Sequence, residues 1–313
     1  MTVEVKTIAC SKSFETGKDV FTFEWRYPRP IHAEIMTHRV FGRGASSSRA
    51  IPMVRMHASI RQDPALPHKY TMNQPGMQGF EEAPLEVQEA AERLIALHRE
   101  QSIQCAEDLA ALGLHKQVCN RYTEPHQHIR VVVTSSQWKN FLRLRNHEMA
   151  EPTFHELARL TGEQIENANF LILERNEWHL PYFDEEEFLD GIHGMSLNDM
   201  KDLVPEPLHD VLPPYSGGRA IGQIMRVGIS AARCARTSYN NFEGKRSTIQ
   251  EDLALAFGKL WSFPLHASPF EHQCLPDWRI GFSKWANPHL HGNLIGFRQA
   301  RKFLPDENGD KDF

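Results

Sequence analysis

The feature that most constrains the fold is a long amphipathic helix pattern that lies between two strand patterns. From Pro84 to Leu112, good helix formers and apolar residues recur at helical spacing, and Gly113 is typical of a helix end. Val20–Trp25 alternates β-branched and aromatic residues, and the Val-Val-Val run within Ile129–Thr134 also indicates a strand. Strands and long helices that interleave in this way predict an α+β fold with a mixed or antiparallel sheet.

The remaining elements follow from the same patterns. Helices are expected over 31–38, from 138, over 153–172 and over 249–260. The segment 61–82 is rich in Pro, Gly, Gln and Met and predicts a long irregular excursion, while the acidic and Pro-rich segment 184–219 predicts an exposed connection. Residues 306–313 are expected to fray. Because no internal repeat is visible, residues 1–313 are expected to form a single domain.

Composition narrows the class of protein. With 41% hydrophobic residues and no long uninterrupted apolar run, the chain is expected to be a cytoplasmic enzyme without a membrane span, and its N-terminus lacks an apolar signal core. A net charge of -5 argues against binding to a nucleic-acid polymer. The five cysteines form no Cys-x-x-Cys pair and are expected to be reduced thiols. The two His-x-His pairs, His126/His128 and His289/His291, lack a third ligand, so no metal is expected.

A basic, hydroxyl-rich passage near the start of the chain is the first candidate site. Guanidinium and hydroxyl donors at this density suit a phosphate or pyrophosphate, and therefore an anionic nucleotide. Taken alone, the passage would be read as a solvated basic loop. Its donors are His38, Arg39, Arg43, Ser47, Ser48 and Arg49.

Three stretches together resemble the flavin-dependent thymidylate synthases. The first is Thr37-His38-Arg39, seven residues, then Ser47-Ser48-Arg49; the others are His266–His272 and Ala235–Tyr239. In that family the stretches matching 235–239 and 266–272 come before the His-Arg signature, whereas here they come last. The chain therefore resembles a circularly permuted member of the kind carried by some bacteriophages, and permutation is tolerated when the old termini lie close together.

The resemblance implies reductive methylation of dUMP to dTMP. Side chains supply neither a one-carbon unit nor a reductant, so methylenetetrahydrofolate, FAD and NADPH are implied as partners of the reaction. Ordinary thymidylate synthases attack the uracil ring with a cysteine, but no cysteine here stands in their Pro-Cys-His context. The family also implies a homotetramer with shared active sites, located in the host cytoplasm if the protein is phage-encoded.

The family's roles carry over residue by residue. The flavin contacts implied are His38, Arg39, Asn140 and Ser268, with Glu271 and His272 holding that loop or the ring system. The nucleotide contacts implied are Ser47, Ser48, Arg49 and Arg121. Arg145 matches the arginine at the uracil edge and is the expected catalytic residue, because a cation there would stabilise negative charge developing on the ring.

Other interpretations remain open. Arg145 could pair with Glu148 on its own helix, and His272 could be an interior histidine. The signature departs from the family at Thr37, at Gly44-Ala45 and at Ala50, and we expect Arg298 and Arg301 of the C-terminal tail to supply replacement cations. Two alternatives therefore stand beside the main hypothesis. One is a flavoenzyme that transfers a methyl or hydroxymethyl group to C5 of another pyrimidine nucleotide; the other is an inactive nucleotide- or flavin-binding homologue.

Overall fold

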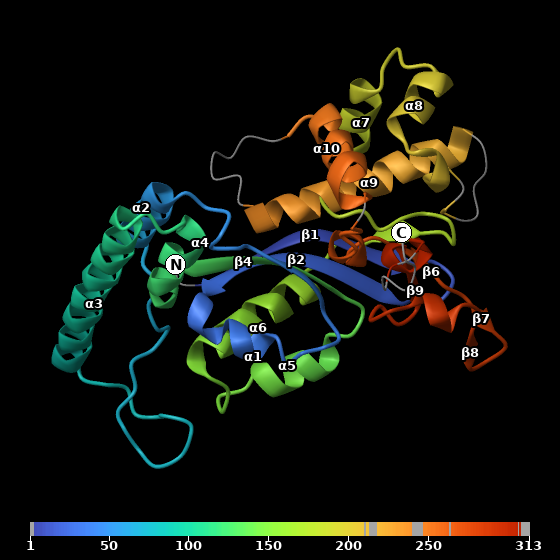
Figure 1. Ribbon diagram of the computed structural model, residues 1–313. Helices are drawn as coiled ribbons and strands as arrows, with labels where there is room; N and C mark the ends of the chain where they lie inside the picture. Colours follow the sequence, from blue (N-terminus) through green and yellow to red (C-terminus); the bar gives the residue numbers. More distant parts are fainter. Residues whose placement is uncertain are drawn as a thin grey trace.

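A five-stranded sheet forms the centre of the structure, a computed structural model that describes residues 3–209, 211–212, 218–239, 247–262, 264–305 and 307 (Figure 1). The strand order is β3-β4-β2-β1-β5. Neighbouring strands are antiparallel except for the parallel pair β1 and β5, so the predicted α+β class with a mixed sheet is confirmed. The strands are β1 (Glu4–Ser13), β2 (Asp19–Pro28), β3 (Gly42–Ala45), β4 (His128–Ser135) and β5 (Leu171–Leu173).

Alternation along β2 gives the sheet two different faces. Phe21, Phe23 and Trp25 point to one face, where they pack with aromatic residues beneath helices α5 (Lys139–Arg145) and α6 (Pro152–Glu166). Burying each of these aromatic side chains stabilises the fold by about 2–3 kcal/mol. The intervening residues of β2 are polar and point to the opposite face.

Helix α9 (Gly218–Tyr239) covers that opposite face, followed by α10 (Ile249–Leu255) and a π turn that continues to Leu260 (Figure 1). Segment 184–219 was expected to be an exposed connection, but it contains helices α7 (Glu185–Gly191) and α8 (Leu197–Leu203). Its residues Phe188, Val204 and Leu208 are buried in the core beneath α9. The acidic residues that suggested a connection instead form the first turn of α7, where they favour the helix N-terminus.

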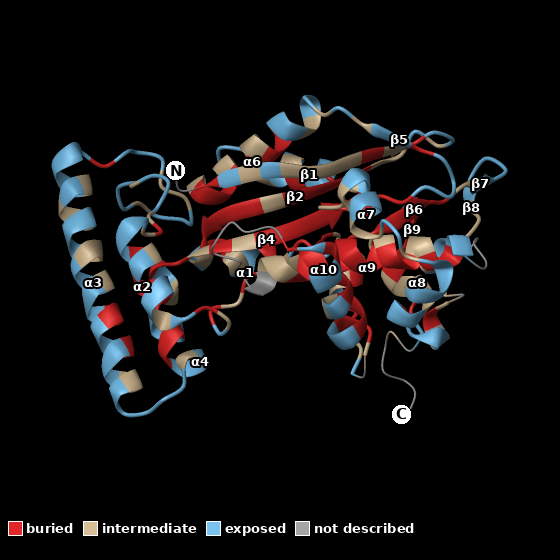
Figure 2. Ribbon diagram, turned by 90° about the horizontal axis from the view of Figure 1, so that it is seen from above, coloured by how far each residue is buried: buried red, intermediate tan, exposed pale blue. Residues whose placement is uncertain are grey.

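Helices α2 (Met53–Gln62), α3 (Leu85–Ala111) and α4 (Lys116–Cys119) stand beside the sheet rather than on it. Helix α3 agrees with the predicted helix, and Gly113 follows it with a positive φ of 89°. Figure 2 shows that most of α3 is exposed; its buried residues are Ser102, Ile103 and Ala106. The backbone from 63 to 84 between α2 and α3 is irregular and is closed by one bridge between Thr71 and Glu82.

Two helix expectations were too long. The stretch 31–38 contains only the single turn α1 (His32–Ile35), and α6 ends at Glu166, so that Leu171–Leu173 forms β5 instead of a last helical turn. The C-terminal part adds the 3-10 helix η5 (Ser268–Glu271), the strand pair β6 (Cys274–Pro276) and β9 (Phe297–Gln299), the hairpin β7 (Arg279–Ile280) and β8 (Lys284–Trp285), and further 3-10 turns. The segment expected to fray lies outside the described residues except for Glu307. Among the described helices, none has both the length and the apolar composition needed to cross a bilayer.

Candidate functional site

The structure brings His38 and Arg145 together, although 107 residues separate them in the chain. Arg145 lies at the end of α5 and donates from Nε to Nε2 of His38 over 3.1 Å. Its guanidinium group lies over the ring of Phe154 at 4.5 Å, and its ion-pair partner is Glu34, 4.0 Å away. The alternative ion pair with Glu148 does not form in the described part of the chain. The predicted flavin contact and the predicted catalytic arginine are therefore neighbours.

The environment of His38 keeps its imidazole neutral. Burial lowers the pKa of His38, and the positive charges of Arg145 and Arg43 lower it further. A guanidinium group only donates hydrogen bonds, so Nε2 of His38 must accept the one from Arg145. The ring proton therefore resides on Nδ1, which leaves this histidine with one N–H donor.

Arg49 and Arg121, the two predicted phosphate-binding arginines, line one cavity of about 520 Å³ together with Gln117, Val118 and Tyr122. A side-chain hydrogen bond holds the loop that carries Arg49, because the hydroxyl group of buried Ser48 donates to Glu124 over 2.7 Å. Ser47 Oγ accepts from the backbone N–H of Arg49, which shapes the turn. Arg49 itself is exposed, and in the described part of the chain the ion-pair partner of Arg121 is Glu124, 3.8 Å away. Two guanidinium groups in one cavity form a suitable anion site.

The C-terminal stretch meets the early stretch at strand β3. A Cβ atom added at Gly42 would lie 3.3 Å from the carbonyl oxygen of Glu271, and one added at Gly44 would lie 3.5 Å from Nε2 of His272. Both glycines occupy the face of β3 that α9 covers, since they pair with Thr134 and Val132 of β4. Glycine at 42 and 44 thus allows η5 to approach the edge strand closely. Residues 42–44 and 271–272, which are far apart in the sequence, therefore lie side by side.

The side chains of three predicted flavin contacts make no hydrogen bond within the described residues. Arg39, Asn140 and Ser268 are all exposed, at the turn after α1, in the first turn of α5 and at the start of η5. Their roles stay predictions. Glu271 forms an ion pair with Arg301, and His272 is fully enclosed in the protomer.

A buried chain of hydrogen bonds crosses the sheet beneath α9. From His272 Nδ1 it runs to Thr134 Oγ1 (2.9 Å), to Thr22 Oγ1 (2.7 Å), to Nε2 of His179 (2.9 Å) and from Nδ1 of that ring to Ser11 Oγ (2.8 Å). Burial lowers the pKa of His272 to about 4 and that of His179 to about 3. The sequence analysis missed this chain. Thr22, set between two phenylalanines, was the available signal that a polar layer lies on the second face of the sheet.

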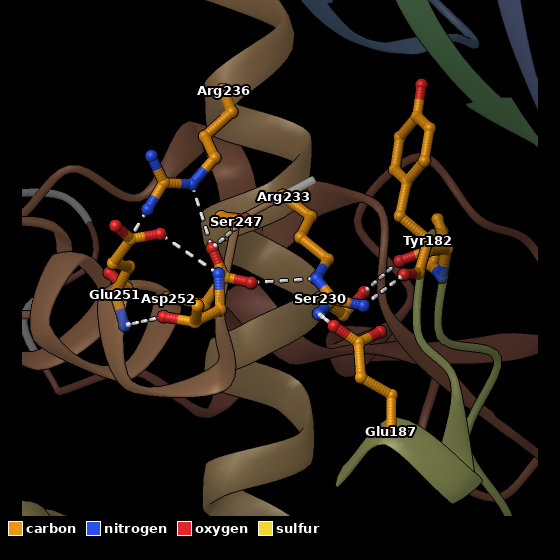
Figure 3. A network of polar contacts seen from close by, with 10 residues as sticks. Tyr182, Glu187, Ser230, Arg233, Arg236, Ser247, Glu251 and Asp252 are labelled. Carbon is orange, nitrogen blue, oxygen red and sulfur yellow. Dashed lines mark hydrogen bonds and ion pairs between the residues drawn. The ribbon is translucent and has the colours of Figure 1, made fainter. Parts of the chain in front are cut away.

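The Ala235–Tyr239 stretch is tied into the fold by the ion pairs of Figure 3. Arg236 donates to Oδ1 of buried Asp252 over 2.8 Å, and Arg233 donates to Oδ2 of the same carboxylate over 2.8 Å. Arg233 also binds Glu187 of α7. These contacts link α9 to α10 and α7, and the side chains of Ser238 and Tyr239 lie outside the described residues.

The C-terminal arginines are engaged within the protein. Arg298 is buried and donates to the backbone carbonyl oxygens of Pro276 and Arg175, while Arg301 binds the carboxylates of Glu271 and Glu307. They were expected to replace missing phosphate ligands, but in this structure they hold the C-terminal segments together. Within the described ranges, no group of three or more His, Cys, Asp or Glu side chains is arranged to hold a metal ion.

Comparisons with known proteins complete the description of the site. No family model matches the sequence, and no curated protein matches it either. Similar solved structures include two crystal structures of a UMP/dUMP methylase, PolB, from Streptomyces cacaoi, bound with 5-Br UMP and with 5-Br dUMP. The structure with 5-Br UMP is 14% identical to this chain with a TM-score of 0.40, and the match covers 52% of this chain and 87% of the PolB chain. The structure with 5-Br dUMP is 13% identical with a TM-score of 0.41, and the match covers 52% of this chain and 89% of the PolB chain. At these TM-scores neither structure assigns an activity to this chain.

Proposed function

We propose that the protein is a flavin-dependent thymidylate synthase with a circularly permuted chain, which converts dUMP to dTMP with methylenetetrahydrofolate, FAD and NADPH. The observation that carries the proposal is that residues with predicted roles in one active site meet in space in two pairs. His38 contacts Arg145, and Arg49 shares a cavity with Arg121. Each pair joins residues that are more than 70 positions apart in the sequence, so local composition does not explain their meeting.

Arg145 is the proposed catalytic group. Its side chain is 26% exposed, with Nε held by His38 and its planar face on Phe154, so the guanidinium orientation is fixed while part of it stays accessible. A fixed cation beside N3 and O2 of uracil stabilises negative charge on the ring as C5 becomes nucleophilic. Because the group is already oriented, little reorganisation is needed when the charge develops.

Arg49 and Arg121 are the proposed phosphate ligands. A dianionic phosphate placed between two guanidinium groups forms charge-assisted hydrogen bonds, which are about twice as strong as neutral ones. Tyr122 adds an exposed ring to the same cavity. The cavity of about 520 Å³ is large enough for the phosphate and part of the sugar.

The donor set also fits a flavin. Neutral His38 with a proton on Nδ1, exposed Arg39, the amide of Asn140 and the hydroxyl of Ser268 would hold the ring and phosphates, since they match carbonyl, ring-nitrogen and phosphate oxygen acceptors. When bound, reduced flavin would supply the reducing equivalents and methylenetetrahydrofolate the one-carbon unit. The protein's own contribution is to bind, orient and polarise the uracil ring.

A homotetramer with shared active sites is part of the proposal. The cavity of Arg49 and Arg121 is lined by neither His38 nor Arg145 among the described residues, so the phosphate pair and the catalytic pair do not share this cavity. Helix α3 also exposes Val87, Leu94 and Leu97 on one side, with Leu94 68% exposed. An exposed apolar stripe of this kind is suited to packing against a second copy.

Mixing two inactive variants tests the sharing of sites. If Arg49 and Arg145 of one site come from different protomers, Arg49→Ala and Arg145→Ala chains that are refolded together should regain roughly a quarter of wild-type activity by random assortment. The assay is run with dUMP well below the dissociation constant of Arg49→Ala, so that each variant alone should show almost no activity. If the mixture also remains inactive while mixed oligomers are present, each site is built from one chain.

The activity is tested directly on the purified protein. We expect a yellow protein with a flavin spectrum that forms dTMP from dUMP, and parallel assays with dCMP and UMP distinguish the related nucleotide activities. Arg145→Ala should retain flavin and lose turnover, whereas Arg143→Ala, on the exposed side of the same helix, should remain active. Near-normal turnover of Arg145→Ala would exclude the proposed role, and a colourless protein that does not bind added FAD would exclude the flavin-dependent reaction.

A further inference from the structure

The hairpin formed by β7 and β8 carries an apolar tip. Phe282 is fully exposed and Ile280 is 61% exposed. Gly281, which separates them, has a positive φ of 65° that closes the turn. Figures 1 and 2 both show the hairpin projecting from the end of the molecule that lies opposite α3. Two large apolar side chains at a projecting tip are typical of a surface that contacts another molecule.

The hairpin is also basic. Residues 278–303 contain no Asp or Glu and five Arg or Lys. Three of the five are engaged by other groups of the protein: Arg298, Arg301 and Lys302. The other two, Arg279 and Lys284, are exposed on the hairpin and form no ion pair within the described residues. Arg279 lies over the ring of Trp285 at 3.7 Å and donates to Ser283 O, which holds its position without neutralising its charge.

A groove between α8 and α10 has the complementary shape and composition. It has a volume of about 500 Å³ and a mainly apolar lining that includes Leu203, Leu253 and Phe257. Leu203 is 40% exposed, so part of this apolar surface is open to solvent. A Cβ atom added at Gly258, on the π turn, would meet nothing within 4 Å, which leaves that side of the groove open within the described residues. The groove can therefore accept an apolar tip.

The groove lies in an acidic part of the chain. Its charged lining residue is Asp202, which is exposed. Residues 184–206 contain eight Asp or Glu and one Lys. Two of the eight are neutralised by arginines of α9. Four others form no ion pair within the described residues: Glu186, Asp190, Asp202 and Glu206. Lys201 and Lys259, which adjoin lining residues in the sequence, offset two of these charges, so this part of the chain keeps a negative excess.

Other occupants match the hairpin tip less well than a second copy does. Nucleic-acid bases stack on aromatic faces, but arginine side chains already occupy a face of both hairpin tryptophans, Trp278 and Trp285. The groove of the same protomer does not hold the tip, because Phe282 is fully exposed. A second copy of the chain supplies an apolar floor and acidic surroundings together.

We propose that the hairpin tip packs into the groove of a second copy of this chain, and that the hairpin of the second copy packs into the groove of the first. Phe282 and Ile280 would cover the apolar floor. Lys284 and Arg279 would face Asp202 and its acidic surroundings. Because hairpin and groove belong to the same chain, one two-fold axis would form the contact twice.

This contact supplies a second interface for the proposed homotetramer. Figures 1 and 2 place the hairpin and α8 toward the end of the protomer opposite α3, so the contact is separate from the apolar stripe of α3. A tetramer of D2 symmetry is built from at least two different two-fold contacts. The inference therefore deepens the proposed homotetramer, and it does not depend on the proposed reaction.

The molar mass of the full-length protein, measured by light scattering over a range of concentrations, tests the contact. Phe282→Ser should convert tetramers to dimers, and adding Leu94→Lys and Leu97→Lys of α3 should give monomers. Met77→Ser, at a 96% exposed residue of the irregular segment before α3, is the matched control and should leave the mass unchanged.

Charge reversal identifies the surface that receives the hairpin. Lys284→Glu and Asp202→Lys should each weaken the association by about tenfold or more, because like charges then face each other. The two changes together in one chain should restore the association. Formation of dTMP by the wild type tests the proposed reaction independently of these masses.

Three outcomes would overturn the proposal. One is a molar mass that Phe282→Ser leaves unchanged, and another is a charge-reversed double variant that associates no better than the single variants while circular dichroism shows all of them folded. The third is binding of the wild type to phosphatidylserine vesicles that Phe282→Ser abolishes at an unchanged oligomeric state, which would assign the tip to a membrane surface instead.

Discussion

The two histidines of the buried chain across the sheet predict a specific sensitivity to acid. His179 is 0% and His272 is 1% exposed, and burial is the largest cause of the lowered pKa of each, about 3 and about 4. Both ring nitrogens of His179 are hydrogen-bonded to hydroxyl groups, so within the described residues no carboxylate contacts this ring to stabilise an imidazolium ion.

The direction and size of the effect follow from proton linkage. Above pH 6.5 both rings are neutral in the folded and the unfolded chain, so they make no pH-dependent contribution. As the pH falls below 6.5 the unfolded chain binds protons that the folded protein does not, and the free energy of unfolding decreases by about 1.4 kcal/mol per pH unit for each histidine until its folded pKa is reached. Between pH 8 and pH 5 each ring should therefore cost about 2 kcal/mol of stability, and the pair about 4 kcal/mol.

Urea unfolding at pH 8 and pH 5 measures this loss. Other histidines with a lowered pKa add to the wild-type loss, so the test is the difference between the wild type and each variant. His179→Gln and His272→Gln should each lose about 2 kcal/mol less than the wild type over this interval. His193→Gln, on the exposed surface, is the matched control and should behave as the wild type. A His272→Gln protein that loses as much stability as the wild type would refute the linkage argument.

Three further perturbations test the remaining contacts. Arg49→Ala should weaken dUMP binding by about 2 kcal/mol in a spectral titration, whereas Arg93→Ala on exposed α3 should not; equal affinity of Arg49→Ala and wild type would remove Arg49 from the phosphate site. Asp252→Ala leaves Arg233 and Arg236 without their shared carboxylate and should lower the free energy of unfolding by about 3–5 kcal/mol in denaturant; a loss below about 1 kcal/mol would show that the pairs are not coupled to folding. Leu94→Lys combined with Leu97→Lys should reduce the molar mass from light scattering with unchanged circular dichroism, and an unchanged mass would exclude α3 from the subunit contact.

Periodicity and residue type predicted the elements with the clearest sequence patterns. Helix α3 and strands β2 and β4 follow directly from their patterns, and Gly113 marks the end of α3 as expected. Periodicity gave the wrong result in two segments, where contacts of a few residues decide the secondary structure or the burial. The 153–172 pattern continues beyond Glu166, but pairing of Leu171–Leu173 with β1 competes with the last helical turn. In the segment 184–219, polar residues suggested exposure, although single apolar residues such as Phe188 anchor it in the core.

The residues of the candidate site were predictable one by one, but their pairing and geometry were not. Motif spacing singled out His38, Arg49, Arg121 and Arg145, and the structure joins them in two pairs. Motif spacing gave no indication that Arg298 would be buried against carbonyl oxygens, because the sequence does not show which group an arginine side chain contacts. The layer of Thr22, Thr134 and His179 was missed for the same reason, since hydrogen bonds between distant segments leave no local period.

The buried chain of hydrogen bonds across the sheet can form only late in the synthesis of the polypeptide. Thr22 and Thr134 find their imidazole partners only after residues 179 and 272 have left the ribosome, and α9, which covers this face, is likewise late in the chain. A nascent chain that ends before residue 218 lacks α9 and therefore presents one side of its sheet to water, with hydroxyl groups that lack their final neighbours. We expect such truncated chains to remain incompletely folded and to be recognised by chaperones. The core then closes only when the polypeptide is complete.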